Sequence, residues 1–448
     1  MAHHGRPQHD AVVSFHQYEI GKAGARHPVR VCTVWKRPRA IVEGKIPHTL
    51  MALVAAATVT PAAAQVRTEA PGGRRVQTAF EALAQDAAEY ARANAVTQEE
   101  ALRRLRAQQE SVPATDRLRE TYRDRLAGIS IEHRPEYRFV VLLTGSEPVP
   151  AQSIFADGMD VPVVFITGAA ATHDQLVAAM RQHQAGISAR YPRMRGMGVD
   201  PRTGEIVVMV QDAGLYRGAE TMDSELEALT AVPIRIRELQ GEDSNSSIEG
   251  GARVEGIDPA NGRRYACTTG FVVTDGSRTG IVTAAHCPDT VTYYAPGQEA
   301  IPLEFVGQWG ARYQDVQVHV GAESDGPFFF ADPEKRTARR LTSWRNRSGT
   351  RAGDAVCRRG ETTGYSCSLV ELVDFAPPGE LCGGPCDPVW VTVAGPTCRS
   401  GDSGGPVFSG TIAFGIVKGG NYGRSGRCNF YYYMSTDYLP EGWSLLYR

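Results

Sequence analysis

A serine held between glycines is the residue of this chain best suited to covalent chemistry. Ser403 stands in the run GDSGGP at residues 401–406. Glycine neighbours permit a tight backbone turn and leave room for a substrate carbonyl beside the hydroxyl. In such a turn the N–H groups of Gly401 and Ser403 can point at the oxygen that becomes negative during acyl transfer. Ser403 is therefore a candidate nucleophile, and Gly401 and Ser403 form a candidate oxyanion hole.

A serine hydroxyl needs a base whose pKa lies near neutrality and a third group that orients this base. His286 follows the apolar run at 280–285, which predicts a strand that ends at the imidazole. Asp315 begins a segment of period two, YQDVQV at 313–318, which would present its carboxylate at the start of a strand. Asp325 and Asp332 also lie between His286 and Ser403, but their Gly/Pro contexts suit the orienting role less well. These residues predict a Ser-His-Asp triad.

Four motifs carry a family resemblance. They are TAAHC at 283–287, VCRRGETTGYSC at 356–367, CRSGDSGGPV at 398–407 and GIVKGGNYGRSGRC at 415–428. From about Ser247 to Arg448 the chain resembles the chymotrypsin-like, or trypsin-fold, serine proteases, and among them the bacterial branch of alpha-lytic protease and the streptogrisins. The resemblance implies an all-β domain of two six-stranded antiparallel β-barrels with the triad in the cleft between them. The order of His286, Asp315 and Ser403 along the chain agrees with it.

The resemblance also implies a buried ion pair beside the nucleophile. Asp402 needs a cation because an unpaired buried carboxylate is costly. Arg358, directly after Cys357, stands at the matching position of the bacterial branch. The alternative is a new amino terminus near IEGG at 248–251, which resembles that of the animal enzymes. The bacterial pairing predicts that a shift of the mature start by a few residues leaves activity intact.

The substrate pocket implied by the resemblance is walled by Thr397, Val417, Lys418, Gly419 and Gly420. No acidic residue stands at its base, so we expect cleavage after small or medium apolar side chains rather than after Arg or Lys. The two glycines would let an extended substrate backbone pair with the chain. These families usually have a serine where this chain has Lys418. Its ammonium could depress the pKa of Asp315, compete with His286 for it, or turn to solvent.

The N-terminal segment, residues 1–64, predicts export. A basic patch, WKRPR at 35–39, precedes a short apolar run at 50–54 and an alanine-rich end at Ala64. This pattern is typical of a secretory signal peptide and is short for a membrane anchor, which is the alternative. The histidines at 3, 4 and 9 could bind a metal, but a leader is the simpler interpretation.

Cysteine placement agrees with export. Cys32 alone precedes the proposed protease domain, and the other cysteines of the chain's nine lie between 267 and 428. An even set in an exported domain predicts disulfides. The resemblance implies Cys267–Cys287, Cys357–Cys367 and Cys398–Cys428, which leaves Cys382 and Cys386 to close a small loop. A thiolate metal site at that loop is the alternative, but no third and fourth ligands are apparent.

Residues 65–245 have a different pattern. Apolar positions predict helices around 80–90, 118–126, 172–186 and near Leu226, and Thr97 with Glu100 resembles a capping box. The helical faces are formed by Phe80, Leu83, Ala87 and Tyr90 and by Leu118, Tyr122 and Leu126. Strands are predicted at 139–143, 163–166, around 197, at 206–210 and at 234–236. The region resembles the α+β pro region of alpha-lytic protease. The alternative is an independent substrate-binding or adhesion domain.

The sequence thus predicts three parts: a leader and signal peptide at 1–64, an α+β pro region at 65–245, and a chymotrypsin-like protease domain at 246–448, with the boundary in the polar run at 241–247. The predicted protein is a secreted, extracellular or periplasmic, monomeric serine endopeptidase that processes its own precursor, with its pro region as folding aid and inhibitor. It needs no metal or organic cofactor. A formal net charge of -2 excludes nucleic acid as the main partner, and no stable membrane association is expected after signal cleavage. The alternatives are an inactive binding module on the protease scaffold and an esterase.

Overall fold

The computed structural model describes residues 69–70, 74–211, 219–239, 242–245, 251–259, 262–294, 300–321, 326–423 and 428–447. The predicted signal peptide, with its histidines and Cys32, lies outside these residues, as do residues 241, 246 and 247 of the predicted boundary. The described residues all belong to one compact unit, Gln65–Arg448.

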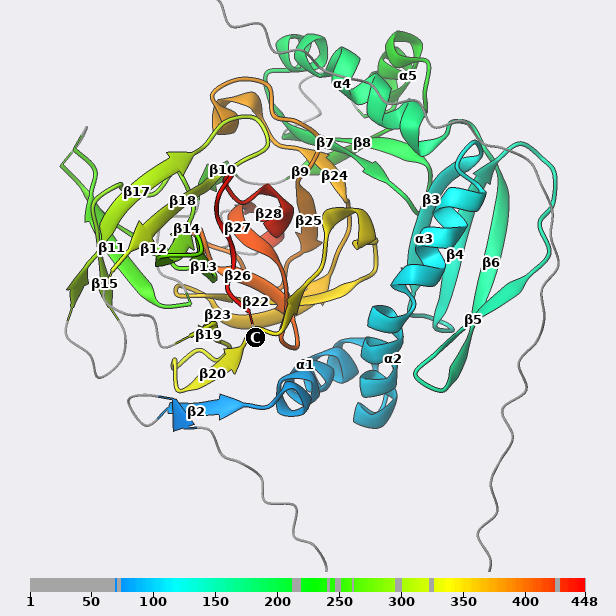
Figure 1. The fold of residues 1–448 in the computed structure, drawn as a ribbon. Helices are drawn as coiled ribbons and strands as arrows, with labels where there is room; N and C mark the ends of the chain where they lie inside the picture. The colour runs from blue at the N-terminus through cyan, green and yellow to red at the C-terminus, as the bar shows by residue number, and fades with distance from the viewer. Residues whose placement is uncertain are drawn as a thin grey trace, which may run out of the picture. The chain divides into compact units, whose positions relative to one another are not determined.

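The C-terminal region comprises the described residues from 251 to 447. The short strands in its first half pair into a closed ring (Figure 1). They are β11 (Arg253–Ile257), β12 (Arg264–Thr268), β13 (Val272–Thr274), β14 (Thr279–Thr283), β15 (Val291–Tyr294), β16 (Ile301–Pro302), β17 (Glu304–Trp309) and β18 (Val316–Val320). Antiparallel pairing follows the orders β12-β11-β15-β16 and β17-β18-β14-β13. Because residues 269–271 alone separate β12 from β13, and Leu303 alone separates β16 from β17, the two orders join into one six-stranded barrel.

The second half forms a second ring. Its strands are β22 (Ala355–Gly360), β23 (Gly364–Leu369), β25 (Val391–Ala394), β26 (Pro406–Ser409), β27 (Ile412–Tyr422) and β28 (Cys428–Ser435). They pair in the order β23-β22-β26-β27-β28-β25, and a bridge between Val370 and Val393 returns to the end of β23. The prediction of two six-stranded antiparallel barrels is confirmed.

Alternating apolar residues explain why these segments form a barrel. In β25 the side chains of Val391 and Val393 lie in one core with Tyr431 and Tyr433 of β28. Residues two apart on a strand point to the same face, so a period of two buries one face and closes the sheet around it. The last strand, β29 (Ser444–Leu445), pairs with β13.

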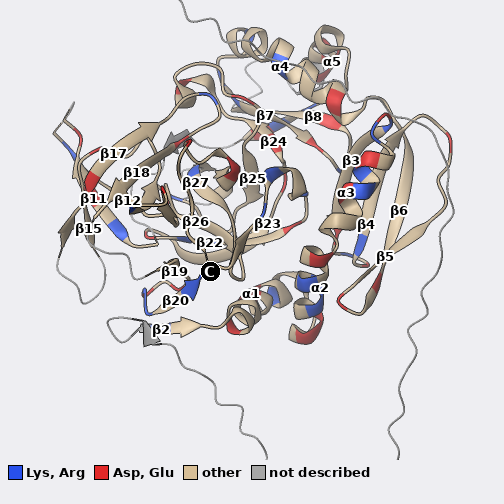
Figure 2. Cartoon of the chain, in the orientation of Figure 1, with Lys and Arg blue, Asp and Glu red and all other residues tan. Residues whose placement is uncertain are grey.

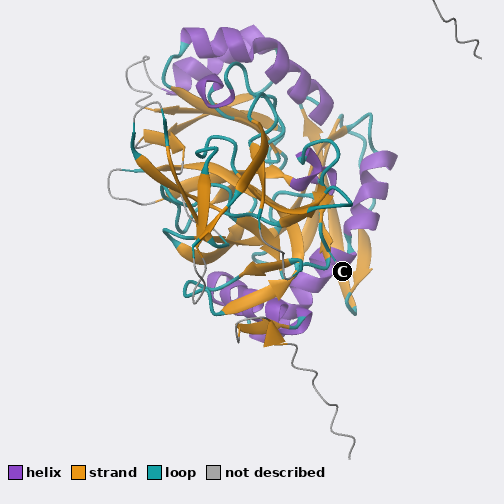
Figure 3. Ribbon diagram, turned by 60° about the vertical axis from the view of Figure 1, so that its left-hand side comes forward, coloured by secondary structure: helices purple, strands orange, loops and turns teal. Residues whose placement is uncertain are grey.

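The N-terminal region is α+β, as predicted (Figure 3). Helices α1 (Ala79–Asn94), α2 (Gln98–Glu110) and α3 (Val112–Thr121) precede a sheet of β3 (Leu126–Glu132), β4 (Arg138–Thr144), β6 (Met159–Ala169) and β5 (Gln152–Ala156). Helices α4 (His173–Arg190) and α5 (Ala219–Thr230) accompany a second sheet of β7 (Met194–Asp200), β8 (Glu205–Gln211) and β9 (Ile234–Leu239). The core of this second part contains Leu176, Met180 and Leu226.

Several helical predictions need correction. Phe80 does not share the buried face of Ala87 and Tyr90, because its side chain is exposed at the first turn of α1. Leu126 belongs to β3 rather than to a helical face, since α3 ends at Thr121. Helix α4 continues past Gly186 to Arg190, because one glycine inside a helix costs only about 1 kcal/mol. The reciprocal capping box is at Thr78, whereas Thr97 caps α2 through its own side chain alone.

Three strand pairings join the N-terminal region to the C-terminal region. Strand β2 (Arg74–Gln77) runs parallel to β20 (Thr337–Arg340). Strand β24 (Asp374–Ala376) adds to the free edge of β7 and so extends the sheet of β7, β8 and β9. Strand β10 (Glu242–Asn245) runs antiparallel to the end of β27. The two regions therefore share backbone hydrogen bonds as well as side-chain contacts.

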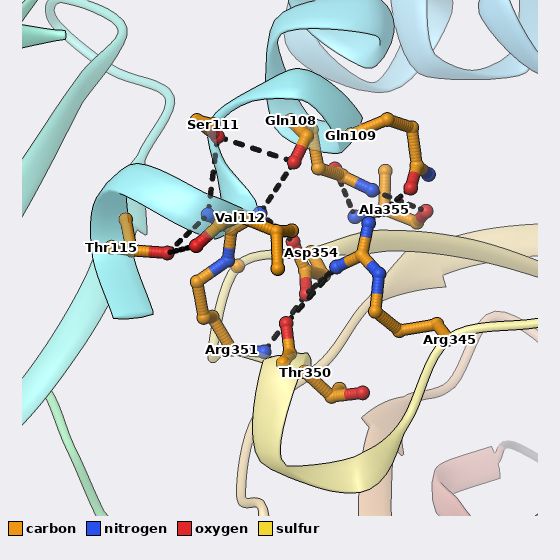
Figure 4. Close-up of polar contacts among 12 residues, drawn as sticks. Gln108, Gln109, Ser111, Val112, Thr115, Arg345, Thr350, Arg351, Asp354 and Ala355 are labelled. Carbon is orange, nitrogen blue, oxygen red and sulfur yellow. Dashed lines mark hydrogen bonds and ion pairs between the residues drawn. The ribbon is translucent and has the colours of Figure 1, made fainter. Parts of the chain in front are cut away.

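Buried polar groups reinforce this association. The guanidinium of Arg351 donates to Ser111 Oγ at 3.1 Å, to Thr115 Oγ1 at 3.2 Å and to the carbonyl of Gln108 at 2.6 Å (Figure 4). Its other partner is the carboxylate of Asp354, at 3.0 Å. Arg351 and Asp354 are both nearly inaccessible to solvent. The junction of α2 and α3 thus supplies the acceptors that a buried arginine of the C-terminal region requires.

Charges elsewhere are mixed over the surface elements rather than gathered by sign (Figure 2). Exposed pairs such as Arg103 with Glu100 on α2 and Arg119 with Asp116 on α3 are typical of solvated helices. Among the described residues, no helix combines the length and the apolar character that a membrane span requires.

Candidate active site

Ser403 lies in the turn that leads into β26, and Thr268 of the first barrel holds this turn in place. The hydroxyl of Thr268 donates to the carbonyl of Gly401, and the N–H of Thr268 donates to the carbonyl of Ser403, both at 2.9 Å. Gly404 has a φ of +81°, and a Cβ there would lie 2.1 Å from the carbonyl oxygen of Thr268. Only glycine fits this position, which explains the glycine after the serine.

The imidazole of His286 connects the two barrels. Its Nε2 lies 2.9 Å from Ser403 Oγ, and its Nδ1 lies 2.9 Å from Asp315 Oδ2. His286 follows β14, whereas Asp315 directly precedes β18, the strand paired with β14. The structure therefore brings together the three side chains that the sequence predicts, although 117 positions separate His286 from Ser403.

The surroundings of these three side chains favour an ionised carboxylate and a fixed imidazole. Asp315 is 2 % exposed and His286 is 17 % exposed. The backbone N–H of His286 also donates to Asp315 Oδ1, at 3.2 Å. Burial alone would raise the pKa of Asp315, but the charges of His286 and Lys418 and their hydrogen bonds outweigh it and lower the pKa to about 2. Asp315 is thus a carboxylate throughout the range in which an imidazole titrates.

Lys418 points into the protein rather than to solvent. Its ammonium lies 3.3 Å from Asp315 Oδ2, and both side chains are 2 % exposed. The backbone carbonyl of Lys418 accepts a hydrogen bond from Ser403 Oγ at 3.1 Å. The sequence left open whether this side chain lies beside Asp315 or turns to solvent, and the structure has it beside Asp315.

Asp402 forms the expected buried ion pair. Its Oδ2 lies 3.0 Å from Arg358 Nη1, and neither side chain is more than 1 % exposed. The hydroxyl of Thr363 and the N–H of Arg399 also donate to this carboxylate. The guanidinium of Arg358 lies over the ring of Tyr431 as well, 5.0 Å from its centroid. The pair fixes the residue before Ser403, and residues 248–250 of the alternative terminus lie outside the described residues.

We expect Arg358→Met to destabilise the protein by about 3–5 kcal/mol, because it leaves Asp402 buried without a counter-charge. Chemical denaturation of the processed protein measures this loss. Arg340→Met is the control, since Arg340 is exposed on β20 and should change the free energy of unfolding by less than about 0.5 kcal/mol. An equal, small loss in both variants would show that another group neutralises Asp402.

The residues assigned to the substrate pocket have different surroundings. Val417 belongs to the core of the second barrel. Thr397 accepts hydrogen bonds from Arg358 through its carbonyl and its hydroxyl. Gly419 and Gly420 pair with Asn245 and Ser244 of β10, so an extended segment of the same chain occupies the edge at which a substrate backbone was expected. His286 also lines a cavity of about 650 Å³ together with Tyr265 and the Cys267–Cys287 disulfide.

The alternative carboxylates do not replace Asp315. Asp332 accepts the N–H groups of Arg336 and Thr337 and so closes its own turn. Asp325 lies outside the described residues.

The four disulfides of the structure join Cys267 to Cys287, Cys357 to Cys367, Cys382 to Cys386, and Cys398 to Cys428. Because Cys382 and Cys386 are bonded to each other, they offer no thiolate for a metal.

Sequence reasoning missed the residues that support the three side chains. Gln317 is fully buried, and its Nε2 donates to the carbonyls of Ala284 and Cys287 on either side of His286. A polar residue in a strand of period two was the only available signal. Thr268 gave none, because a threonine in a strand is ordinary. The pairing of β10 was missed because its sequence, EDSN, has little strand propensity.

Comparisons with known proteins find matches to part of this chain. No family model matches the chain. It is 28% identical over 181 residues to Streptogrisin-C of Streptomyces griseus, a match that covers 36% of this chain and 33% of that protein. The resemblance to bacterial chymotrypsin-like serine proteases is confirmed. The chain thus spans about a third of the length of the curated relative it matches.

Solved structures with similarity include Protease A of Thermobifida fusca and the Nocardiopsis protease NAPase. The first has a TM-score of 0.36 and 22% identity and covers 45% of this chain and 99% of its own. The second has a TM-score of 0.35 and 21% identity and covers 45% of this chain and 98% of its own.

Proposed function

We propose that this chain is the precursor of a serine endopeptidase. The observation that carries the proposal is the continuous path from the Asp315 carboxylate through the His286 imidazole to the Ser403 hydroxyl, with both contacts at 2.9 Å. Only a base with an oriented tautomer makes a serine hydroxyl nucleophilic near neutral pH. The path supplies such a base and the group that orients it.

In the proposed reaction His286 Nε2 takes the proton of Ser403 as the hydroxyl oxygen attacks a peptide carbonyl. Asp315 accepts the hydrogen bond of Nδ1–H and stabilises the imidazolium that forms. The N–H groups of Gly401 and Ser403 bind the oxyanion. His286 then gives the proton to the departing amine, which leaves an acyl-enzyme. Water repeats the cycle and releases the acid.

We further propose that the first bond to be cut is in the chain itself. Strand β10 supports this, because it runs antiparallel to β27 with Ser244 opposite Gly420 and Asn245 opposite Gly419. The next residue of β27 in this direction is Lys418, whose carbonyl touches Ser403 Oγ. Asn245 is therefore opposite the residue next to Lys418, which supports a first cut near this point of the chain. A cut there divides an N-terminal region of 65–245 from a protease domain of 246–448.

The same pairing supports inhibition by the N-terminal region. A segment that fills the edge of β27 excludes any other extended substrate from it. The shared strands β2 with β20 and β7 with β24 support a templating role in folding, since a barrel with many non-local contacts folds slowly without one. The disulfides support export to an oxidising compartment after removal of residues 1–64. The proposed mature enzyme is a monomer that cuts after small or medium apolar residues.

A fluorophosphonate probe tests the nucleophile. We expect the processed, disulfide-bonded protein to form one adduct per molecule, which peptide mapping assigns to Ser403. Absence of the adduct in fully processed protein would favour a binding module on a protease scaffold.

A panel of peptides and simple esters then separates an endopeptidase from an esterase, because the endopeptidase alone also hydrolyses internal peptide bonds.

A further inference from the structure

Lys418 occupies an irregular point of β27. Val417 pairs with Tyr433 and Gly419 pairs with Tyr432, so Lys418 is an extra residue in a β-bulge. A bulge changes the direction in which a side chain points. Here it accompanies a side chain that enters the interior, with the ammonium 3.3 Å from Asp315 Oδ2 and 5.3 Å from the centroid of the Trp390 ring.

This location requires a charge partner. Burial of an ammonium is strongly unfavourable unless an anion compensates it. Asp315 provides that anion, and the electron-rich face of Trp390 adds to the attraction. Among the described residues, the charged groups that act on Asp315 are His286 and Lys418. One carboxylate therefore serves two cationic groups when the imidazole is protonated.

Because Lys418 and His286 share one carboxylate, Lys418 changes the balance of charge around His286. With neutral His286, the pair of Lys418 and Asp315 has no net charge. When His286 takes the proton of Ser403, the three groups together become positive in a buried place, and Lys418 repels the new imidazolium. Lys418 therefore opposes the positive charge that forms beside Asp315.

We propose that Lys418 is a positioning residue that extends the activity of this enzyme toward acidic pH, because its charge holds Asp315 as the carboxylate beside His286. The proposal rests on the proposed function of Ser403. The low pKa of Asp315, about 2, agrees with it. Asp258, Asp289 and Tyr265 line the same cavity as His286, and the uncharged sulfur of Met434 from β28 accepts the backbone N–H of Asp315.

The test is the pH profile of kcat/KM for a peptide substrate, measured on processed enzyme from pH 4 to 9. Lys418→Met removes the charge and keeps the length of the side chain. Lys418→Gln removes the charge and keeps a hydrogen-bond donor for Asp315. We expect the acid limb of both variants to move up by about one pH unit, which is about a tenfold loss at pH 5 relative to the value at pH 8. Lys418→Arg keeps the charge and should keep the acid limb of the wild type.

Lys335→Met is the matched control, since it removes a lysine whose partner is Glu361 rather than Asp315. Its acid limb should coincide with that of the wild type. Acid limbs of the Met and Gln variants that coincide with the wild type would overturn the proposal. If only the Met variant moves, the hydrogen bond rather than the charge is responsible, which also overturns it. The wild type separates this failure from failure of the proposed function, because a wild type without fluorophosphonate labelling refutes the triad itself.

Discussion

Ser403→Ala is expected to leave the precursor uncut and to reduce peptide hydrolysis by about 10⁶-fold. The substitution removes the only protein atom that bonds to the carbonyl carbon in the proposed reaction, while His286 and Asp315 keep their contact. Mass spectrometry of the exported protein measures the cut, and we expect no new amino terminus after Asn245. Initial rates on a peptide substrate measure hydrolysis.

The control for this substitution is Ser409→Ala. Ser409 is also buried, at the end of β26, but lies outside the triad. We expect normal processing and a rate within a few fold of the wild type. A Ser403→Ala precursor that is cut after Asn245 at the normal rate, in cells without another protease, would contradict self-processing. Retained hydrolysis would contradict the choice of nucleophile.

Asp86→Ala is expected to destabilise the uncut precursor by about 3–5 kcal/mol. Asp86, on α1, lies 2.9 Å from Arg339 Nη1, and the two side chains are at most 2 % exposed. It also accepts the hydroxyl of Tyr365 at 2.7 Å and the N–H of Gly410 at 2.5 Å. Removal of this carboxylate takes away the acceptor that Arg339, Tyr365 and the N–H of Gly410 share. Buried donors without an acceptor cost free energy.

Denaturant unfolding of the Ser403→Ala precursor, with and without Asp86→Ala, measures this loss without interference from processing. Glu89→Ala is the matched control on the same helix, because Glu89 pairs only with the exposed Arg92 and should contribute less than about 1 kcal/mol. A loss below 1 kcal/mol for Asp86→Ala would show that α1 does not dock on the C-terminal region in this way.

The sequence pointed to the three side chains of the candidate site because each proposed role accepts few residue types. A glycine-flanked serine, a histidine at a strand end and an aspartate at a strand start are recognisable locally, and the structure brings Ser403, His286 and Asp315 together. The apolar run at 280–285 and the period-two segment at 313–318 predicted strands where β14 and β18 lie, whereas the two barrels were implied by the family resemblance. The helix predicted through Leu126 failed because apolar spacing at a helix-to-strand boundary fits both periods for a few residues.

Long-range partners were not predictable. Asp86 and Arg339 are 253 positions apart, and each is an ordinary charged residue of its own element. Periodicity indicates whether a position is buried but not which distant group meets it. Lys418 illustrates the same limit: its departure from the family pattern was visible, but its direction depends on a bulge in β27 that no local pattern specifies.

The strand pairings between the two regions have a consequence for work on the isolated N-terminal region. The outer edge of β7 is completed by β24, which the chain reaches only at Asp374, and β2 is completed by β20. A fragment that ends at Asn245 would present both strands with unsatisfied amides and carbonyls, and such edges recruit further strands. Recombinant preparations of that fragment should therefore oligomerise in a concentration-dependent way, and addition of the mature protein should dissolve the oligomers.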